Sequence, residues 1–139
     1  AVASYHRAGG KLGVLVALSG VNGDKANALG RDIVMQVAAM NPLGLNRDSI
    51  SADTVNREIE IYKTQMRNEG KKEEFIDRIA QGKLEKFYQD NCLLEQSFIK
   101  DASKTVTDLL KEAGAGITVT GFVRMQLGEG QHEPALAEA

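Results

Sequence analysis

The chain has 139 residues, 42% hydrophobic and 26% charged, with a formal net charge of -2 at pH 7. This suits one modest soluble domain, and it provides no excess of Lys and Arg for a nucleic-acid-binding surface. The single cysteine, Cys92, excludes an intrachain disulfide, and no apolar stretch approaches the roughly 20 residues that span a membrane, so we expect a protein of the cytoplasm or an organelle matrix.

Two short strands are predicted at the start of the chain. Val2 to Tyr5 and Leu12 to Leu18 are separated by Ala8-Gly9-Gly10, which permits a tight reversal. The second strand is apolar at nearly every position, as expected when both of its faces are covered. The sequence therefore predicts a β-hairpin in the interior.

A helix is predicted from about residue 26 to residue 40, because apolar residues recur there every three or four positions. Asn41-Pro42 should end it, since the residue before a proline avoids the helical conformation. We expect its apolar face to cover the sheet. That face comprises Ala26, Leu29, Ile33, Val37 and Met40.

Long charged side chains dominate the next segment, where two more helices are predicted. Ser51 is a suitable N-cap for the first, and Asn68-Glu69-Gly70 is a suitable stop. Two heptads per helix are too few for a stable isolated coiled coil. We therefore expect an antiparallel hairpin that is stabilised by contacts with the body or with a second copy of the chain. Its seam should contain Val55, Ile59, Tyr62 and Met66 in the first helix, and Phe75, Ile79 and Phe87 in the second, with Ile76 and Leu84 beside them.

Globular character returns at Cys92-Leu93-Leu94. Thr105 to Asp108 has the form of a capping box that begins a short helix. A final strand is predicted from apolar residues that alternate with polar ones, leaving one face in solvent. Its apolar positions are Ile117, Val119, Val123, Met125 and Leu127.

No group of residues typical of an enzyme or a cofactor site is found in the sequence. His6 and His132 lie at opposite ends without further metal ligands nearby, and Cys92 precedes an apolar pair, as a core residue would. The glycines lack the Gly-Lys-Ser or Gly-Lys-Thr of a phosphate-binding loop. We therefore expect no cofactor, no metal and no catalysis, but a role in binding or assembly.

Three stretches of the sequence are specific enough to indicate a family, namely Ser4-Tyr5 with Lys11 to Val16, Met35 to Pro42, and Leu84 to Thr105. They closely resemble elongation factor Ts, the bacterial nucleotide exchange factor for elongation factor Tu. The most specific part is Leu93-Leu94-Glu95-Gln96-Ser97-Phe98-Ile99-Lys100-Asp101. Phe122-Val123-Arg124 and Leu127-Gly128-Glu129-Gly130 extend the resemblance over residues 1 to 130.

The resemblance implies an α+β fold, with a three-stranded antiparallel sheet packed with helices and an inserted antiparallel coiled coil. Residues 1–46 and 92–130 would form the C-terminal core subdomain, and 47–91 the hairpin often called the dimerisation domain. Residues 131–139 would be a flexible tail or a C-terminal module. The family's Thr-Asp-Phe-Val motif, which inserts into the partner's nucleotide domain, does not occur in this sequence. Its absence implies a docking role with weak or no exchange activity by this chain alone.

In that family the C-terminal subdomain docks on elongation factor Tu. The resemblance implies one contact region at Phe98, Ile99 and Lys100 and a second at Tyr5, His6 and Arg7. From the residues alone, Phe98 is instead expected to fill the core. The alternative function is self-association without exchange activity, as a homodimer held by the hairpin residues Val55, Ile59, Tyr62, Met66, Phe75 and Ile79.

Overall fold

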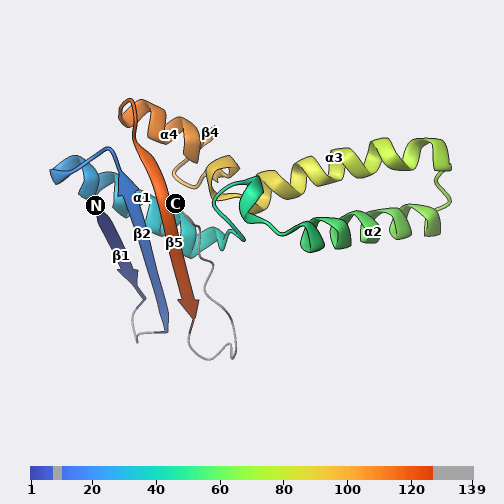
Figure 1. Ribbon diagram of the computed structural model, residues 1–139, viewed down its shortest axis with the longest axis horizontal. Helices are drawn as coiled ribbons and strands as arrows, with labels where there is room; N and C mark the ends of the chain where they lie inside the picture. The colour runs from blue at the N-terminus through green and yellow to red at the C-terminus, as the bar shows by residue number, and fades with distance from the viewer. Residues whose placement is uncertain (8–10, 127–139) are drawn as a thin grey trace.

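A layered body carries a projecting helical hairpin in the computed structural model, which describes residues 1–7 and 11–126 (Figure 1). The expected turn at Ala8-Gly9-Gly10 and the expected tail at 131–139 lie outside these residues. The elements are β1 (Val2–His6), β2 (Leu12–Ser19), α1 (Gly23–Met40), α2 (Ala52–Asn68), α3 (Glu73–Asn91), β3 (Ser97–Phe98), β4 (Asp101–Thr105), α4 (Val106–Ala113) and β5 (Thr118–Gln126). Single 3-10 turns, η1 (Arg47–Ser49) and η2 (Leu93–Glu95), flank the hairpin.

The main sheet has three strands in the order β1-β2-β5, and both pairings are antiparallel. This confirms the predicted α+β fold class. A second sheet, in which β3 pairs with β4, was not predicted. No helix in the described part of the chain is long and apolar enough to cross a membrane.

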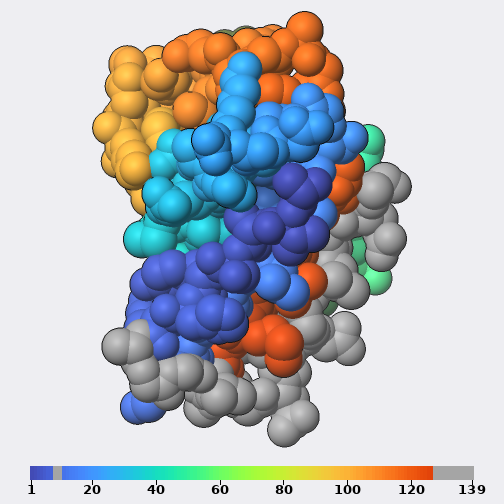
Figure 2. All heavy atoms as spheres, turned by 90° about the vertical axis from the view of Figure 1, so that its left-hand side faces the viewer, coloured from blue at the N-terminus to red at the C-terminus, as the bar shows by residue number. Residues whose placement is uncertain are grey.

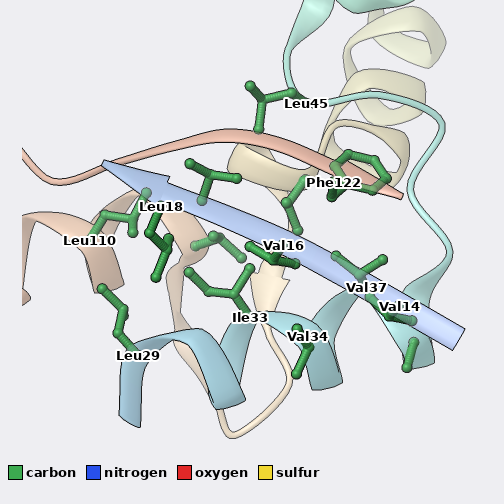
Figure 3. Packing of buried hydrophobic residues seen from close by; sticks show 14 of the residues in the cluster. Val14, Val16, Leu18, Leu29, Ile33, Val34, Val37, Leu45, Leu110 and Phe122 are labelled. Atoms are coloured by element: carbon green, nitrogen blue, oxygen red, sulfur yellow. The ribbon is translucent and has the colours of Figure 1, made fainter. Parts of the chain in front are cut away.

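The main core lies between the sheet and α1 (Figure 3). Gly30 allows a close approach of α1 to β1, because a Cβ at this position would lie 2.6 Å from the Cβ of Ala3. Met40 was predicted on the buried face but is 45% exposed, because it is the last residue of α1 and Asn41 already has a left-handed φ of 46°. The inward side chains labelled in the close view include Val14, Val16 and Leu18 from β2 and Leu29, Ile33, Val34 and Val37 from α1.

The prediction that both faces of β2 are covered is wrong. α1 covers one face, whereas Leu15 on the other face is 48% exposed. Val2 is 72% exposed, and with Leu15 and Val123 it lines an open apolar hollow of about 290 Å³. A continuous apolar run therefore does not by itself reveal which face of a strand is covered.

A β-bulge changes the predicted alternation of β5. Leu18 pairs with Val119 and Ala17 pairs with Gly121, so that Thr120 is an additional residue on β5. Beyond the bulge Phe122 points into the core, while Met125 is 52% exposed. Val123 and Met125 were predicted on the same face as Val119, which is wrong because one extra residue exchanges the two faces.

Helix α2 of the hairpin with α3 begins and ends where the sequence predicts. The Ser51 side chain accepts a hydrogen bond from the Thr54 amide, and Gly70, after α2, has a φ of 79°. The buried face of α3 contains Ile76, Ala80 and Leu84. Phe75, predicted on this face, is 44% exposed, because the packed face of α3 lies one residue further along the helix.

Candidate docking surface

The segment predicted to contact a partner forms a tight turn. Phe98 at the end of β3 pairs with Asp101 at the start of β4, so that Ile99 and Lys100 are the two turn residues. The Ile99 side chain is 42% exposed, and Phe98 is 5% exposed, as expected from the residues alone. An exposed isoleucine on a two-residue turn, supported by a buried phenylalanine, can insert into an apolar pocket of a partner.

Side chains of helix α1 accept hydrogen bonds from both turn residues, Ile99 and Lys100. The Ile99 amide donates a hydrogen bond of 2.9 Å to Oε1 of Gln36, a side chain with no exposed surface. The Lys100 ammonium donates a hydrogen bond of 2.6 Å to Oδ1 of Asp32. Asp32 and Gln36 are four residues apart and therefore lie on the same face of the helix. The turn is thus fixed against the surface of α1.

The second predicted contact region lies at the end of β1. Tyr5 is half-buried and packs against the main core, whereas His6 and Arg7 are exposed. The Arg7 amide donates a hydrogen bond of 3.0 Å to the Leu12 carbonyl, which closes the β1–β2 pair. This end of the sheet therefore presents the exposed side chains of His6 and Arg7 on a backbone held by the β1–β2 pairing.

The two regions do not meet. Figure 2 shows the gold β3–β4 segment and the indigo end of β1 on either side of the cyan C-terminal half of α1. That part of α1 exposes Ala39 and Met40. A partner that contacts both regions therefore has to cover the C-terminal half of α1 as well.

Several of the residues predicted to mediate self-association pack instead against other residues of the same chain. Met66 is 1% exposed and packs with Ile76 and Ala80, and Tyr62 and Ile79 lie against this cluster. Burial, followed by a hydrogen bond with Glu58, raises the pKa of Tyr62 to about 12.

The other predicted seam residues are more accessible. Val55 and Ile59 are half-buried, and Phe75 is exposed. Ile61, which lies outside the predicted seam, is 43% exposed. The hairpin thus retains two exposed large apolar side chains, Ile61 and Phe75.

Arg47 connects the base of the hairpin to the body. Its guanidinium donates hydrogen bonds of 2.7 and 3.0 Å to the two carboxylate oxygens of Glu85 in α3, and two of 2.9 Å to those of Glu95 in η2. It also lies 4.4 Å from the centre of the Tyr88 ring. These bonds raise the pKa of Arg47, and the same contact lowers the pKa of Glu85. Cys92, next to this junction, is fully buried, and burial raises its pKa to about 11.

Sequence reasoning missed the residues that position the turn and the hairpin, namely Asp32, Gln36 and Arg47. Gln36 carries a usable signal, because it is polar between the apolar residues Met35 and Val37 on a helix face that was expected to be buried. Among residues 1–7 and 11–126 no group of three potential metal ligands is found.

Comparison with known proteins places the whole described region in one family. The Elongation factor TS family matches residues 1–129. Elongation factor Ts of Cytophaga hutchinsonii is 48% identical over 126 residues, which cover 91% of this chain and 45% of that protein. The Halothermothrix orenii protein of the same name is 47% identical (91% and 42%), and that of Clostridium botulinum strain Kyoto is 46% identical over 134 residues (93% and 44%). The chain spans less than half the length of these relatives.

Proposed function

The chain belongs to the elongation factor Ts family, and on that premise we propose that it binds elongation factor Tu and takes part in the release of GDP during protein synthesis. The family match over residues 1–129 is the observation that carries this proposal, because it includes the exposed turn and both helices of the hairpin. The chain would act in the bacterial cytoplasm. It would act by binding alone, without making or breaking a covalent bond.

The mechanism would be thermodynamic linkage. A protein that binds nucleotide-free elongation factor Tu more tightly than the GDP-bound form must lower the affinity for GDP by the same factor. This chain would supply the anchoring part of that binding free energy. The absence of Thr-Asp-Phe-Val from its sequence supports an anchoring role rather than a direct disturbance of the nucleotide site.

Ile99 would be the central apolar contact, with Phe98 supporting it from beneath and Lys100 at its side. Tyr5, His6 and Arg7 would form the second contact region, at the end of β1. In this proposal residues 1–46 and 92–130 are the docking subdomain and residues 47–91 are the inserted hairpin. The exposed fraction of Ile99, 42%, supports direct contact by its side chain.

A substitution of Ile99 tests the docking role against a matched control. Ile99→Asp should weaken binding to elongation factor Tu by about tenfold or more, because a buried charge replaces an apolar contact. Ile61→Asp is the control, since Ile61 is 43% exposed on the hairpin and should leave the affinity nearly unchanged. Isothermal titration calorimetry with nucleotide-free elongation factor Tu measures both. Equal affinities for Ile99→Asp and the unmodified chain would contradict the docking site.

Release of fluorescent GDP from elongation factor Tu tests the proposed division of roles. We expect weak or no stimulation by this chain, and strong stimulation by a full-length relative measured in parallel. Rapid release by this chain alone would show that anchoring is not its main contribution. Failure of the chain to bind elongation factor Tu at micromolar concentration would contradict the proposed function itself.

Self-association through the hairpin is the second candidate function. Exposed Ile61 and Phe75 favour it, because two accessible large apolar side chains on one hairpin can contact a second copy. The buried cluster around Met66 would stay within each chain. Sedimentation velocity at two concentrations distinguishes a monomer from a dimer, and Phe75→Asp should reduce any dimer that forms through this surface.

A further inference from the structure

A chain of buried side-chain amides connects the Ile99 turn with the base of the hairpin. The Ile99 amide donates to Gln36 Oε1, Gln36 Nε2 donates to Gln96 Oε1 at 3.1 Å, and Gln96 Nε2 donates to the Asp90 carbonyl at 2.9 Å. Gln36 is 0% and Gln96 is 1% exposed, and they are the two buried polar residues found among the described residues. This series of hydrogen bonds thus extends from the Ile99 turn on the surface, through Gln36 of α1, to the last turn of α3.

The orientation of both amides is determined by their neighbours. The Ile99 N–H requires an acceptor, which places Oε1 of Gln36 beside it and leaves Nε2 to donate to the Ser97 carbonyl at 3.0 Å and to Gln96. Gln96 must then accept with Oε1 and donate with Nε2. Hydrogen bonds aligned in one direction polarise each other, and a buried partner left unpaired has a high cost.

We propose that Gln36 is the positioning residue for the Ile99 turn, and that the Gln36–Gln96 pair couples this turn to the base of the hairpin. Movement of the turn shifts the position of the Gln36 amide. The shift weakens the Gln36–Gln96 hydrogen bond and with it the bond from Gln96 to the Asp90 carbonyl at the end of α3. The part of this proposal that concerns partner binding rests on the proposed function. The coupling within the chain does not.

The unmodified protein provides the first test, because no variant has to fold. The Ile99 amide should be protected from hydrogen exchange although its side chain is exposed. The adjacent Lys100 amide, for which the described residues provide no hydrogen-bond partner, is the internal control and should exchange about tenfold faster or more. Exchange of both amides at the same rate would overturn the role of Gln36.

Two variants test the coupling. Gln36→Met removes both ends of the bridge with little change in length, and it should accelerate exchange at Ile99 by about tenfold. Gln96→Met leaves the Gln36 bond to Ile99 in place but removes the bond to Asp90. Because Cys92 lies at the base of the hairpin and is fully buried, its reaction rate with a thiol reagent measures opening of this base. Both variants should increase that rate.

The double variant and a control separate coupling from general destabilisation. If both residues act along one connection, Gln36→Met with Gln96→Met should increase the Cys92 rate little more than Gln96→Met does. Val34→Ala, which removes two methyl groups from a 1% exposed position on α1, should lower global stability without selective exchange at Ile99. An unchanged Cys92 rate in Gln36→Met, or multiplied effects in the double variant, would overturn the coupling.

Binding provides the reciprocal measurement. If elongation factor Tu binds the turn, it should slow the Cys92 reaction in the unmodified chain, and Gln96→Met should remove most of this effect. Binding that leaves the Cys92 rate unchanged would overturn the coupling. Absence of any binding would instead contradict the proposed function, while the exchange results on the isolated chain would still decide the role of Gln36.

Discussion

The body and the hairpin are stabilised in different ways, although both contain long helices. In the body, sixteen buried apolar residues among those that the structure describes, from the sheet, α1, α4 and the connecting segments, form one cluster. In the hairpin, the corresponding cluster has three buried members, Met66, Ile76 and Ala80. The hairpin therefore depends on helix formation, on ion pairs and on its attachment to the body, whereas the body depends on apolar burial.

The largest effect is expected from a cavity in the body. Ile33 has no exposed surface and packs between α1 and β2, so Ile33→Ala should lower the free energy of unfolding by about 3 kcal/mol. Urea titration followed by circular dichroism measures this loss. Because the cavity lies in the main core, sheet and α1 should unfold together at the lower urea concentration. A loss below about 1 kcal/mol would contradict the central place of Ile33 in the core.

An equally buried residue in the hairpin should behave differently. Met66 is 1% exposed, and Met66→Ala should weaken the hairpin locally by about 2 kcal/mol. Segment-resolved hydrogen exchange should show faster exchange in α2 and α3 and little change in β2 and α1. Equal acceleration in both regions would show that the hairpin and the body unfold as one unit and are not stabilised separately.

The parts of the fold that sequence reasoning predicted well depend on local signals. The N-terminal ends of α2 and α4 follow from Ser51 and Thr105, each of which accepts a hydrogen bond from the backbone amide three residues later. The errors arise where a tertiary feature intervenes. The extra residue Thr120 in β5 exchanges the faces of Val123 and Met125, and alternation alone cannot locate a bulge.

The candidate site shows the same limit. The sequence indicated the segment Phe98 to Lys100 through a family resemblance, but not the arrangement that buries Phe98 and leaves Ile99 as the exposed apolar residue. Gln36, which holds the turn, lies 63 residues away in the chain. As a polar residue on an apolar helix face, Gln36 leaves a signal in the sequence. Its partner, the Ile99 amide, leaves none, because long-range pairing has no periodic pattern in one sequence.

The smallest effect is expected at the junction of the two regions. Arg47→Met removes the bonds to Glu85 and Glu95, and it should lower the stability of the hairpin slightly at pH 7, because Arg47 is accessible to water. Lys63→Met is a suitable control, since the Lys63–Asp77 pair lies within the hairpin and Asp77 is 84% exposed. Its effect should be smaller still, because that pair does not join the hairpin to the body.

The pH dependence of the Arg47 effect identifies its electrostatic part. Arg47 lowers the pKa of Glu85 from its ordinary value of 4.5, so the stabilisation is complete above that pH and is lost as the pH falls through the lowered value. The difference in urea midpoint between the unmodified chain and Arg47→Met should therefore be present at pH 7 and smaller at pH 3. A residual difference should persist in acid, since the guanidinium still stacks on Tyr88 when the carboxyl is neutral. A difference that is the same at both pH values would assign the whole effect of Arg47 to packing, and the hairpin would then be attached to the body by the same kind of contact that stabilises the core.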